Sequence, residues 1–565
     1  MKDRRLITWR VLGLISLVVL FGPSLWEHIV LARDPHIFND DVRHWLCPYF
    51  RCADPSLFPN DVLVNYRQAM TPVGHRLLFG ALARVADPHT ISAWLPVAQY
   101  AALLVALGYS AWRMGGWRGA WATLALTLSS YVFLHHTAGG TSRSWGFLLV
   151  AMAAAFLLSG RAGWLAPLTI VATALYPPVA FVLGLTLAIR LLVQRARPAR
   201  RITLLAVTAA ASAVILMAET PRGYGRRLGA ADIAAYPELG PGGRYGPDDR
   251  APFLGVPSAL ADAFGRTLQG GEPAWIPALR TRIMAGSTYG KPSLWLLLVS
   301  GLAGWITLWG GAHLWRRRTP SRGLFALMAA SAVAYAAAAW FAPALYLPQR
   351  YMIYTLPVLT VLLFPAALHE LARHYQLKWP GMLVVGGTTA CLLLLGGHGG
   401  GRTGLSIDAG YHPRLYAEIA ALPADAFIAG WPEGIMDNIP WLCRRSVFIN
   451  RESHEALHKD VADLMRARMS DLVSAYFATS SDSLERLRST WGVSHLLIDL
   501  NHFEAAAPVY FEPYNEQVRQ AHAGMRQQGS EILRRLHQLA VYQDGPLVLL
   551  ALDRVSYAKE PLAGE

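Results

Sequence analysis

The stretch ISAWLPVAQYAALLVALGYSAW, residues 91–112, has 22 consecutive positions without a charged side chain. A helix needs about 20 apolar residues to cross the hydrocarbon core of a bilayer, so this stretch predicts a membrane-spanning helix. Similar apolar runs recur before about residue 400, whereas the remainder has charges scattered among helical and strand-like patterns. The sequence therefore predicts an α-helical polytopic membrane protein with a separate C-terminal soluble part.

The composition of the whole chain agrees with this division. Of 565 residues, 53% are hydrophobic and 16% are charged. A soluble protein of this length usually has about a quarter of its residues charged. The net charge of +14 would suit a nucleic-acid-binding protein. Here, however, arginine clusters fall between apolar runs, as in membrane proteins, so we expect no nucleic-acid partner.

A scan for apolar runs predicts about eleven spans. They are residues 6–21, 91–112, 119–134, 145–158, 164–175, 178–193, 202–218, 294–314, 324–342, 352–368 and 382–395. The first follows the basic segment MKDRR but lacks a convincing small-residue cleavage site, so we interpret it as a retained signal anchor. The fifth and sixth runs are separated by Tyr176-Pro177-Pro178 and form either a tight hairpin or one broken helix.

The loops between these runs predict an orientation. If the N-terminus is cytoplasmic, five short loops on that side hold Arg113, Arg118, Arg161, Arg195, Arg197, Arg200, Arg201, Arg316, Arg317, Arg318, Arg322, Arg373 and Lys378. Short basic loops are typical of the cytoplasmic side. A transmembrane domain of residues 1–400 would then place its long loops, 27–90 and 219–293, on the outer side. We expect a bacterial inner membrane with residues 404–565 in the periplasm.

The C-terminal part alternates strand-like and helix-like segments. Residues 426–431, 446–449, 495–500 and 547–552 are predicted as strands, and residues 411–422, 466–478 and 481–490 as helices. This alternation indicates a small α/β domain. It contains no glycine-rich loop of the dinucleotide or P-loop type, so we do not expect a nucleotide enzyme.

Two adjacent carboxylates occur in the first long loop, in DPHIFNDD, residues 34–41. A carboxylate beside a membrane-proximal cavity can act as general base toward an acceptor hydroxyl. We therefore select Asp40 and Asp41 as candidate catalytic residues, of which one would face the cavity, because neighbouring helical residues point about 100° apart. The alternative is an acidic helix start capped by Asn39 or Asp40, which spacing alone favours.

The connection between the third and fourth spans, HHTAGGTSRSW at residues 135–145, is polar. His135 and His136 suggest a metal, but two adjacent histidines do not easily bind one ion and no carboxylate accompanies them. We interpret them as a polar interfacial pair, one of which lines a cavity. Arg143 would lie on the outer side, where the positive-inside rule disfavours arginine, so it is a candidate substrate-binding residue.

The same argument selects Arg350 in YLPQRY, residues 346–351, at the outer end of a proline-broken helix. An arginine flanked by aromatic residues such as Tyr351 can form forked hydrogen bonds with a phosphate at headgroup depth. The alternative is an interface anchor that snorkels to the membrane surface, and the residues favour neither.

Cys47 and Cys52 lie close together in the first long loop. They could form a disulfide in an oxidising compartment, although two unpaired thiols fit the sequence equally well. Four cysteines in the whole chain are too few for a disulfide framework.

Together these features resemble the GT-C superfamily of polytopic glycosyltransferases, which includes the oligosaccharyltransferase catalytic subunit, protein O-mannosyltransferases and the aminoarabinose transferase of lipid A. The resemblance covers most of the chain and implies a sugar donor linked to polyprenyl phosphate. It assigns catalysis to the first-loop acidic position, here Asp40 and Asp41, and contact with the lipid phosphate to Arg350. The segment AGWPEG, residues 429–434, with Asp437 and Asn438 after it, loosely resembles the oligosaccharyltransferase motif region. That motif itself is absent.

The leading hypothesis is therefore transfer of a sugar from a polyprenyl-phosphate-linked donor to a cell-envelope acceptor at the periplasmic face. The second acidic motif of metal-dependent members is replaced by the stretch with His135, His136 and Arg143, so the residues support no divalent metal, and no cofactor is expected. The runner-up is a transporter or flippase of a lipid-linked solute, which would need ionisable residues within the spans and often has internal repeats. A third hypothesis is a non-catalytic membrane protein that displays a periplasmic domain.

Overall fold

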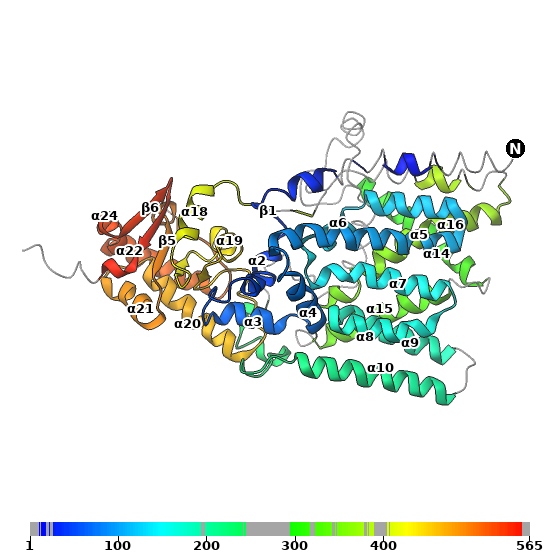
Figure 1. Cartoon of the computed structure of the whole chain (residues 1–565), viewed down its shortest axis with the longest axis horizontal. Helices are drawn as coiled ribbons and strands as arrows, with labels where there is room; N and C mark the ends of the chain where they lie inside the picture. The colour runs from blue at the N-terminus through cyan, green and yellow to red at the C-terminus, as the bar shows by residue number, and fades with distance from the viewer. Residues whose placement is uncertain are drawn as a thin grey trace, which may run out of the picture.

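The computed structural model describes residues 11, 13–18, 22, 26–193, 198–240, 242–244, 294–316, 322–341, 345, 347–377, 381, 383–388, 404–405, 407–504 and 506–555. Figure 1 shows a bundle of long helices at one end and a compact part that contains a β-sheet at the other. Short helices of the first long loop lie between these two parts. The predicted spans at residues 6–21 and 382–395 fall largely outside the described residues, as does residues 245–293 of the second long loop.

The apolar run 91–112 and most of the run 119–134 lie in α5 (Pro88–Ser129), which reverses direction at Gly116. The backbone angle φ of Gly116 is +63°, in the left-handed region that glycine adopts without strain. The two arms pack side by side: the hydroxyl of Tyr100 in the first arm donates a hydrogen bond of 3.1 Å to the carbonyl of Thr127 in the second. The two runs are therefore antiparallel arms, as two successive spans must be.

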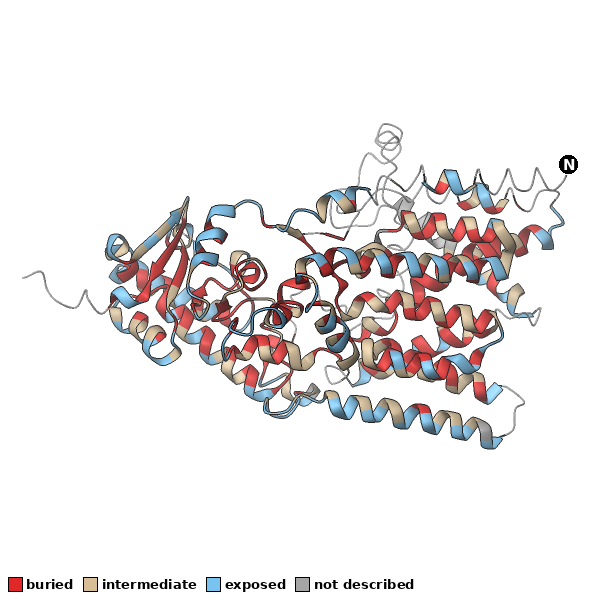
Figure 2. Ribbon diagram, in the orientation of Figure 1, coloured by how far each residue is buried: buried red, intermediate tan, exposed pale blue. Residues whose placement is uncertain are grey.

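The remaining helices of the bundle follow in chain order. They are α6 (Tyr131–Thr137), α7 (Gly146–Leu158), α8 (Leu165–Leu175), α9 (Pro177–Val193), α10 (Pro198–Glu219), α14 (Leu294–Arg316), α15 (Arg322–Trp340) and α16 (Thr355–His374). The short 3-10 helices η2 (Ala138–Gly140), η3 (Ser142–Trp145), η4 (Ala162–Trp164) and η8 (Pro348–Tyr351) connect them. Figure 2 shows that α10, at the edge of the bundle, is mostly exposed, whereas α7 and α16 are largely buried.

Within the described residues, four helices are long and apolar enough to cross a membrane. They are Pro88–Ser129, Arg201–Glu219, Arg322–Trp340 and Thr355–His374. Three shorter apolar segments accompany them: Ser142–Leu158, Ala162–Leu175 and Pro177–Val193. The chain is thus a multi-pass helical membrane protein. Ile202 and Met217 on α10 are exposed, and no core formed by the described residues covers them. Such an exposed apolar surface fits contact with lipid.

The structure distinguishes between the two alternatives for the proline-separated runs. The helices α8 and α9 pack along each other, and a Cβ atom on Gly184 would lie 3.7 Å from the Thr169 side chain. The chain therefore forms a tight hairpin at Tyr176, whose backbone is non-helical. A single broken helix would have kept these residues apart.

The start of α7 packs with almost no spare room against the start of α16. A Cβ atom at Gly146 would lie 2.4 Å from the ring of Tyr354, which is itself buried. We therefore expect Gly146→Ala to destabilise the chain by about 1–3 kcal/mol, because an overpacked core must shift to accept the methyl group. Thermal unfolding in detergent measures the effect. Gly163→Ala, which has open space, is the matched control, and equal melting of the two variants would contradict the prediction.

The first long loop is folded. It contains β1 (Ile37–Phe38), α2 (Val42–Trp45), η1 (Cys47–Cys52), α3 (Val62–Met70) and α4 (Val73–Leu82). Strand β1 pairs antiparallel with β2 (Ile407–Asp408), just after the bundle. Loop residues such as Phe38, Leu46 and Phe50 share one apolar core with Ile428 and Trp441 of the C-terminal part. The loop is therefore anchored on the sheet-bearing part.

The C-terminal part holds a five-stranded sheet with the order β4-β3-β5-β7-β6. Its strands are β3 (Phe427–Gly430), β4 (Ser446–Val447), β5 (His495–Asp499), β6 (Ala540–Asp544) and β7 (Leu547–Ala551). Strand β3 runs parallel to β4 and β5, and β7 runs antiparallel to β5 and β6. The helices around it are α18 (Pro413–Ala421), α19 (Ile435–Leu442), α20 (Lys459–Tyr476), α21 (Ser481–Trp491), α22 (Tyr514–Gln528), α23 (Glu531–Arg534) and α24 (Leu536–Leu539). All four predicted strands lie in this sheet.

The second long loop also contributes to this part. Leu228, Tyr236 and Leu239 share the apolar core around α20 with Met465 and Tyr476. This loop also includes the short η5 (Ala230–Asp232) and η6 (Pro237–Leu239), while η9 (Leu500–Phe503) and η10 (Leu552–Val555) follow strands of the sheet. Segments that sequence separates by two hundred residues therefore pack together at the end of the bundle that carries the sheet.

Candidate functional site

The two candidate carboxylates point to different partners. Asp41 is the residue before α2, and its side chain caps no backbone amide. Its Oδ2 instead lies 2.7 Å from Nε of Arg143, and both side chains are mostly buried. The carboxylate of Asp40 receives a hydrogen bond from Nη2 of Arg43 and remains 45% exposed. The side chains of Asp40 and Asp41 therefore point in different directions, as expected of adjacent residues. Neither carboxylate acts as the helix cap.

Asn39 ties this acidic turn to the end of the bundle. Its side chain is fully buried; its Nδ2 donates to the carbonyl of Gly404 at 2.9 Å, and its Oδ1 accepts from Nη2 of Arg143 at 3.3 Å. The backbone amide of Asp41 also donates to Oδ1 of Asn39 at 3.2 Å. Arg143, in η3 at the start of α7, thus holds the first loop against the bundle. Arg143 and Asp41, which the sequence analysis selected separately, are therefore in contact.

Arg43 joins Asp40 to the C-terminal part. Its Nη1 donates to Oδ1 of Asn438 at 3.1 Å and lies 3.9 Å from a carboxylate oxygen of Asp437. Its Nη2 donates to Oε1 of Glu452 at 3.2 Å. A buried guanidinium with several oxygen partners is well satisfied, because five N–H groups are available. Arg43 and Glu452 were not among the candidate residues of the sequence analysis.

Glu452 has further partners from two loops. Its Oε2 lies 3.3 Å from Nη2 of Arg244 and 3.6 Å from Nδ1 of His44. Burial raises the pKa of Asp437 to about 6 and that of Glu452 to about 7, because a low-dielectric environment disfavours their charged forms. Burial also holds the pKa of His44 well below its usual value, so this ring is neutral. Arg43, Arg244, Asp437 and Glu452 therefore form a buried ionic network where the two long loops meet the C-terminal part.

The two histidines lie at the end of α6, beside this turn. A Cβ atom on Gly404, the residue that accepts from Asn39, would lie 2.8 Å from Cα of His135. The ring of His136 contacts the ring of Tyr354 edge-on, with centroids 5.8 Å apart. His135 therefore lies near the residue that binds Asn39, and His136 packs on the start of α16. Among the described residues, no three His, Cys, Asp or Glu side chains come together as metal ligands.

Arg350 and Tyr351 lie in η8, one turn before Tyr354. Tyr351 is buried, its hydroxyl donates to the carbonyl of Leu345 at 3.0 Å, and its carbonyl accepts from Ser331 at 2.5 Å. Burial raises the pKa of Tyr351 to about 12, an effect that the positive charge of Arg227 partly opposes. Tyr351 therefore supports the backbone of η8, while the half-buried Arg350 occupies the same turn.

The disulfide considered for Cys47 and Cys52 is wrong for this structure, in which both thiols are free. The two residues begin and end η1. A 3-10 helix rises about 2 Å per residue, so five steps separate their Cα atoms by about 10 Å. A disulfide needs Cα atoms closer than about 7 Å. Burial also raises the pKa of the Cys47 thiol, which makes it unreactive.

Comparison with known proteins places this geometry in a recognised fold. No protein-family model and no curated protein matches the sequence. The Archaeoglobus fulgidus oligosaccharyltransferase in complex with Zn and sulfate matches with a TM-score of 0.50 and 12% identity, over 87% of this chain and 68% of that chain. The same protein tethered with an acceptor peptide matches with a TM-score of 0.50 and 11% identity, over 94% and 72%.

A second protein covers more of the chain with weaker superposition. ArnT from Cupriavidus metallidurans in the apo state aligns over 97% of this chain and 98% of that chain at 14% identity, but a TM-score of 0.38 is too low to support an argument. The likeness to the oligosaccharyltransferase shows the fold and not the activity. The sequence analysis named oligosaccharyltransferases among the proteins that the chain resembles, and the fold agrees with that resemblance.

Proposed function

We propose that the chain is a membrane glycosyltransferase that moves a sugar from a polyprenyl-phosphate-linked donor to a cell-envelope acceptor. The observation that supports this most is the pairing of Asp41 with Arg143 at the end of the bundle, beside a second carboxylate that remains half exposed. The second carboxylate, Asp40, can reach an acceptor as a base. Its neighbour in the chain, Asp41, holds Arg143, a cation suited to a phosphate. The fold shared with an oligosaccharyltransferase supports the same reaction class.

The reaction needs a base and a stabilised leaving group. The acceptor hydroxyl oxygen attacks the anomeric carbon of the sugar, the bond between that carbon and the phosphate oxygen breaks, and polyprenyl phosphate leaves. Asp40, the more exposed carboxylate, takes the hydroxyl proton. Arg350, with Arg143, stabilises the charge that develops on the phosphate, as preorganised cations do. We assign His135, His136 and Tyr351 to substrate binding beside these groups.

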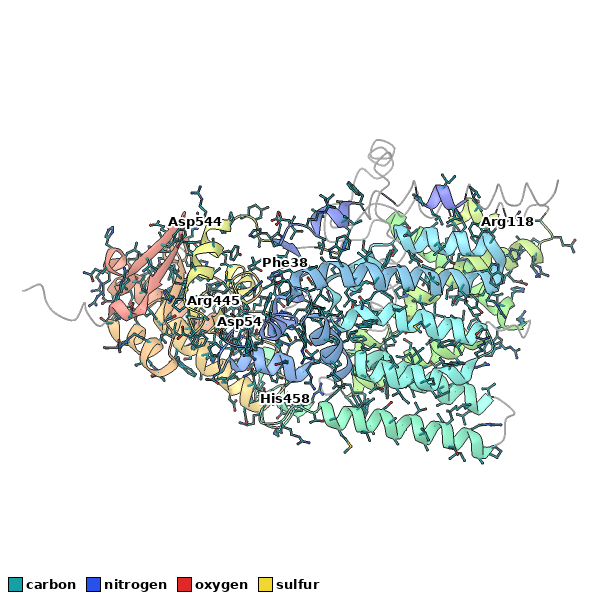
Figure 3. The ribbon with its side chains drawn as sticks, viewed as in Figure 1. Phe38, Asp54, Arg118, Arg445, His458 and Asp544 are labelled. Atoms are coloured by element: carbon teal, nitrogen blue, oxygen red, sulfur yellow. The ribbon has the colours of Figure 1, made fainter. Side chains whose placement is uncertain are left out.

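The orientation proposal places this chemistry on the outer face of a bacterial inner membrane. Arg118, close to the reversal of α5 between two predicted spans, lies at the end of the bundle away from His458 and Asp544 of the C-terminal part (Figure 3). Basic loops favour the cytoplasmic side, so the C-terminal part, residues 404–565, would lie in the periplasm. About eleven spans in residues 1–400 fit this arrangement, because an odd number carries the chain from a cytoplasmic N-terminus to the outside.

The residues present do not fit a divalent metal. The oligosaccharyltransferase comparison structure contains Zn. In this chain Asp40 and Asp41 each pair with an arginine, so a positive charge already occupies the place that a cation would take. The proposed mechanism therefore contains no metal-dependent step.

One experiment separates transfer from transport. The full chain in lipid nanodiscs is incubated with decaprenyl-phosphate hexoses and pentoses, with and without envelope lipids as acceptors, and the lipids are analysed by mass spectrometry. We expect one donor to lose its sugar and to yield decaprenyl phosphate. In proteoliposomes a flippase would move the intact donor across the bilayer, and a display protein would leave it unchanged. Either of those results would overturn the proposed function.

A further inference from the structure

Two segments that follow parallel strands of the sheet, one a helix and one a loop, carry buried carboxylates that face the first loop. Asp437 lies in α19, which follows the carboxyl end of β3, and Glu452 lies in the loop after β4. Their side chains are 5% and 14% exposed. The backbone amide of Glu452 donates to Oδ1 of Asp437 at 3.0 Å, so the two groups are fixed relative to each other. Loops at the carboxyl ends of parallel strands often carry functional side chains.

Both carboxylates meet one guanidinium, which also holds Asp40. Arg43 is 8% exposed and contacts Glu452 at 3.2 Å and Asp437 at 3.9 Å. The same guanidinium binds the Asp40 carboxylate through Nη2 and the Asp40 carbonyl through Nε at 3.1 Å. Two contacts to one residue fix both its backbone and its side chain. We call Asp437, Glu452 and Arg43 the carboxylate clamp.

We propose that Glu452 and Asp437 are positioning residues for the reaction, which hold Arg43 and through it fix the carboxylate of Asp40. This inference rests on the proposed function. It gives the C-terminal part a role in the reaction, because α19 and the loop after β4 complete a site that begins in the first loop. Neither carboxylate needs to touch the substrate.

The charges around Glu452 give the clamp a pH dependence with a definite sign. The groups that face Glu452 are Arg43 and His44 from α2, Arg244 from the second loop, Asp437 from α19, and Asp40. Arg67 from α3 donates to the backbone carbonyl of Glu452 at 2.6 Å. Carboxyl groups usually titrate near pH 4. Burial raises the pKa of Asp437 to about 6 and that of Glu452 to about 7, so both are mostly protonated at pH 5. A neutral carboxyl holds a guanidinium weakly, and the clamp therefore tightens as the pH rises through about 7.

The test is the kinetics of Glu452→Gln in the full chain, with the decaprenyl-phosphate sugar that the wild type consumes. We expect kcat to fall about 10- to 100-fold, because a misplaced catalytic group costs about this much. The KM for the donor should remain within about twofold, since the arginines that meet the phosphate are unchanged. The wild-type rise in kcat between pH 5 and pH 8 should be flattened. Glu516→Gln, in an exposed ion pair with Arg519, is the matched control and should behave as wild type.

A double-mutant cycle shows whether Glu452 acts through Arg43. Arg43→Gln combined with Glu452→Gln should cost no more than Arg43→Gln alone, because both break one chain of contacts. Asp437→Asn is a second variant should Glu452→Gln not fold. Full additivity, or wild-type kcat and pH profile in Glu452→Gln, would overturn the inference while Asp40→Asn still tests the proposed function.

Amide hydrogen exchange gives a readout that needs no substrate. Glu452→Gln should lose protection in residues 39–46, whereas the amides of β5 should remain as protected as in the wild type. Exchange is compared at one pH after correction for intrinsic rates. Unchanged protection of residues 39–46 would overturn the clamp whatever the activity, because a group that no longer holds its neighbour must loosen it.

Discussion

Replacing Asp40 by asparagine is expected to lower kcat for sugar transfer by about 10²- to 10⁴-fold, the usual contribution of a general base. Asparagine has nearly the same shape and can still accept from Arg43, so the loss would come from the missing proton acceptor. The half-exposed Asp40 side chain can meet a hydroxyl from outside the cluster, whereas Asp41 is mostly enclosed by its pairing with Arg143. The measurement is single-turnover release of decaprenyl phosphate.

Two further variants sharpen this comparison. Asp41→Asn should lose less in kcat and more in donor affinity, because it releases Arg143 from its partner. Asp34→Asn is the control: Asp34 lies in the same loop, is about half exposed and pairs with His36. Full activity in both Asp40→Asn and Asp41→Asn would remove the first loop from the chemistry. Equal loss in Asp34→Asn would show that any charge change in this loop disturbs folding.

The spans could be predicted because their driving force is local. An uninterrupted apolar run shows its preference for lipid within one window of sequence, and α5, α8 and α9 cover the runs predicted there. The positions at which the helices end depend instead on the local backbone geometry. The second arm of α5 ends at Ser129, whereas the apolar run continued to residue 134, because the backbone of Ser130 is extended before α6 begins. Hydropathy contains no information about that break.

Strand β6 and helix α22 of the C-terminal part were not predicted, although the sequence contains a signal for each. Strand β6 is joined to β7 by the two-residue turn Gly545-Pro546, and φ of Gly545 is +59°. A glycine at the first position of a two-residue turn between two strand-like runs is a hairpin signal. Helix α22 buries Tyr514, Val518 and Met525 on one face, a helical spacing that could also have been recognised.

The clamp could not be predicted from one sequence. Arg43 and Glu452 are 409 residues apart, and their contact depends on how the first loop packs on the sheet. Asp437 was noted only through a loose resemblance to a motif region. In contrast, Arg143 could be selected from the sequence, because an arginine in a loop predicted to lie on the outer side departs from the positive-inside rule. Single residues that violate a pattern can be found in a sequence, and pairs that meet across the fold cannot.

Replacing Arg350 by glutamine is expected to lower kcat/KM for the lipid-linked donor by about 10²- to 10³-fold, as loss of one preorganised charge-stabilising donor does. Arg350 lies in η8, whose backbone is held by the buried Tyr351, so the guanidinium starts from a rigid turn. Arg350→Lys distinguishes the two roles considered for this residue. A phosphate ligand should lose activity, because lysine cannot form the forked pair of hydrogen bonds, whereas an interface anchor should tolerate lysine fully. Inhibition by added decaprenyl phosphate should weaken in parallel with activity. Arg161→Gln, in an exposed loop after α7, is the control. Wild-type kinetics for Arg350→Lys would assign Arg350 to the membrane interface and leave Arg143 as the phosphate ligand.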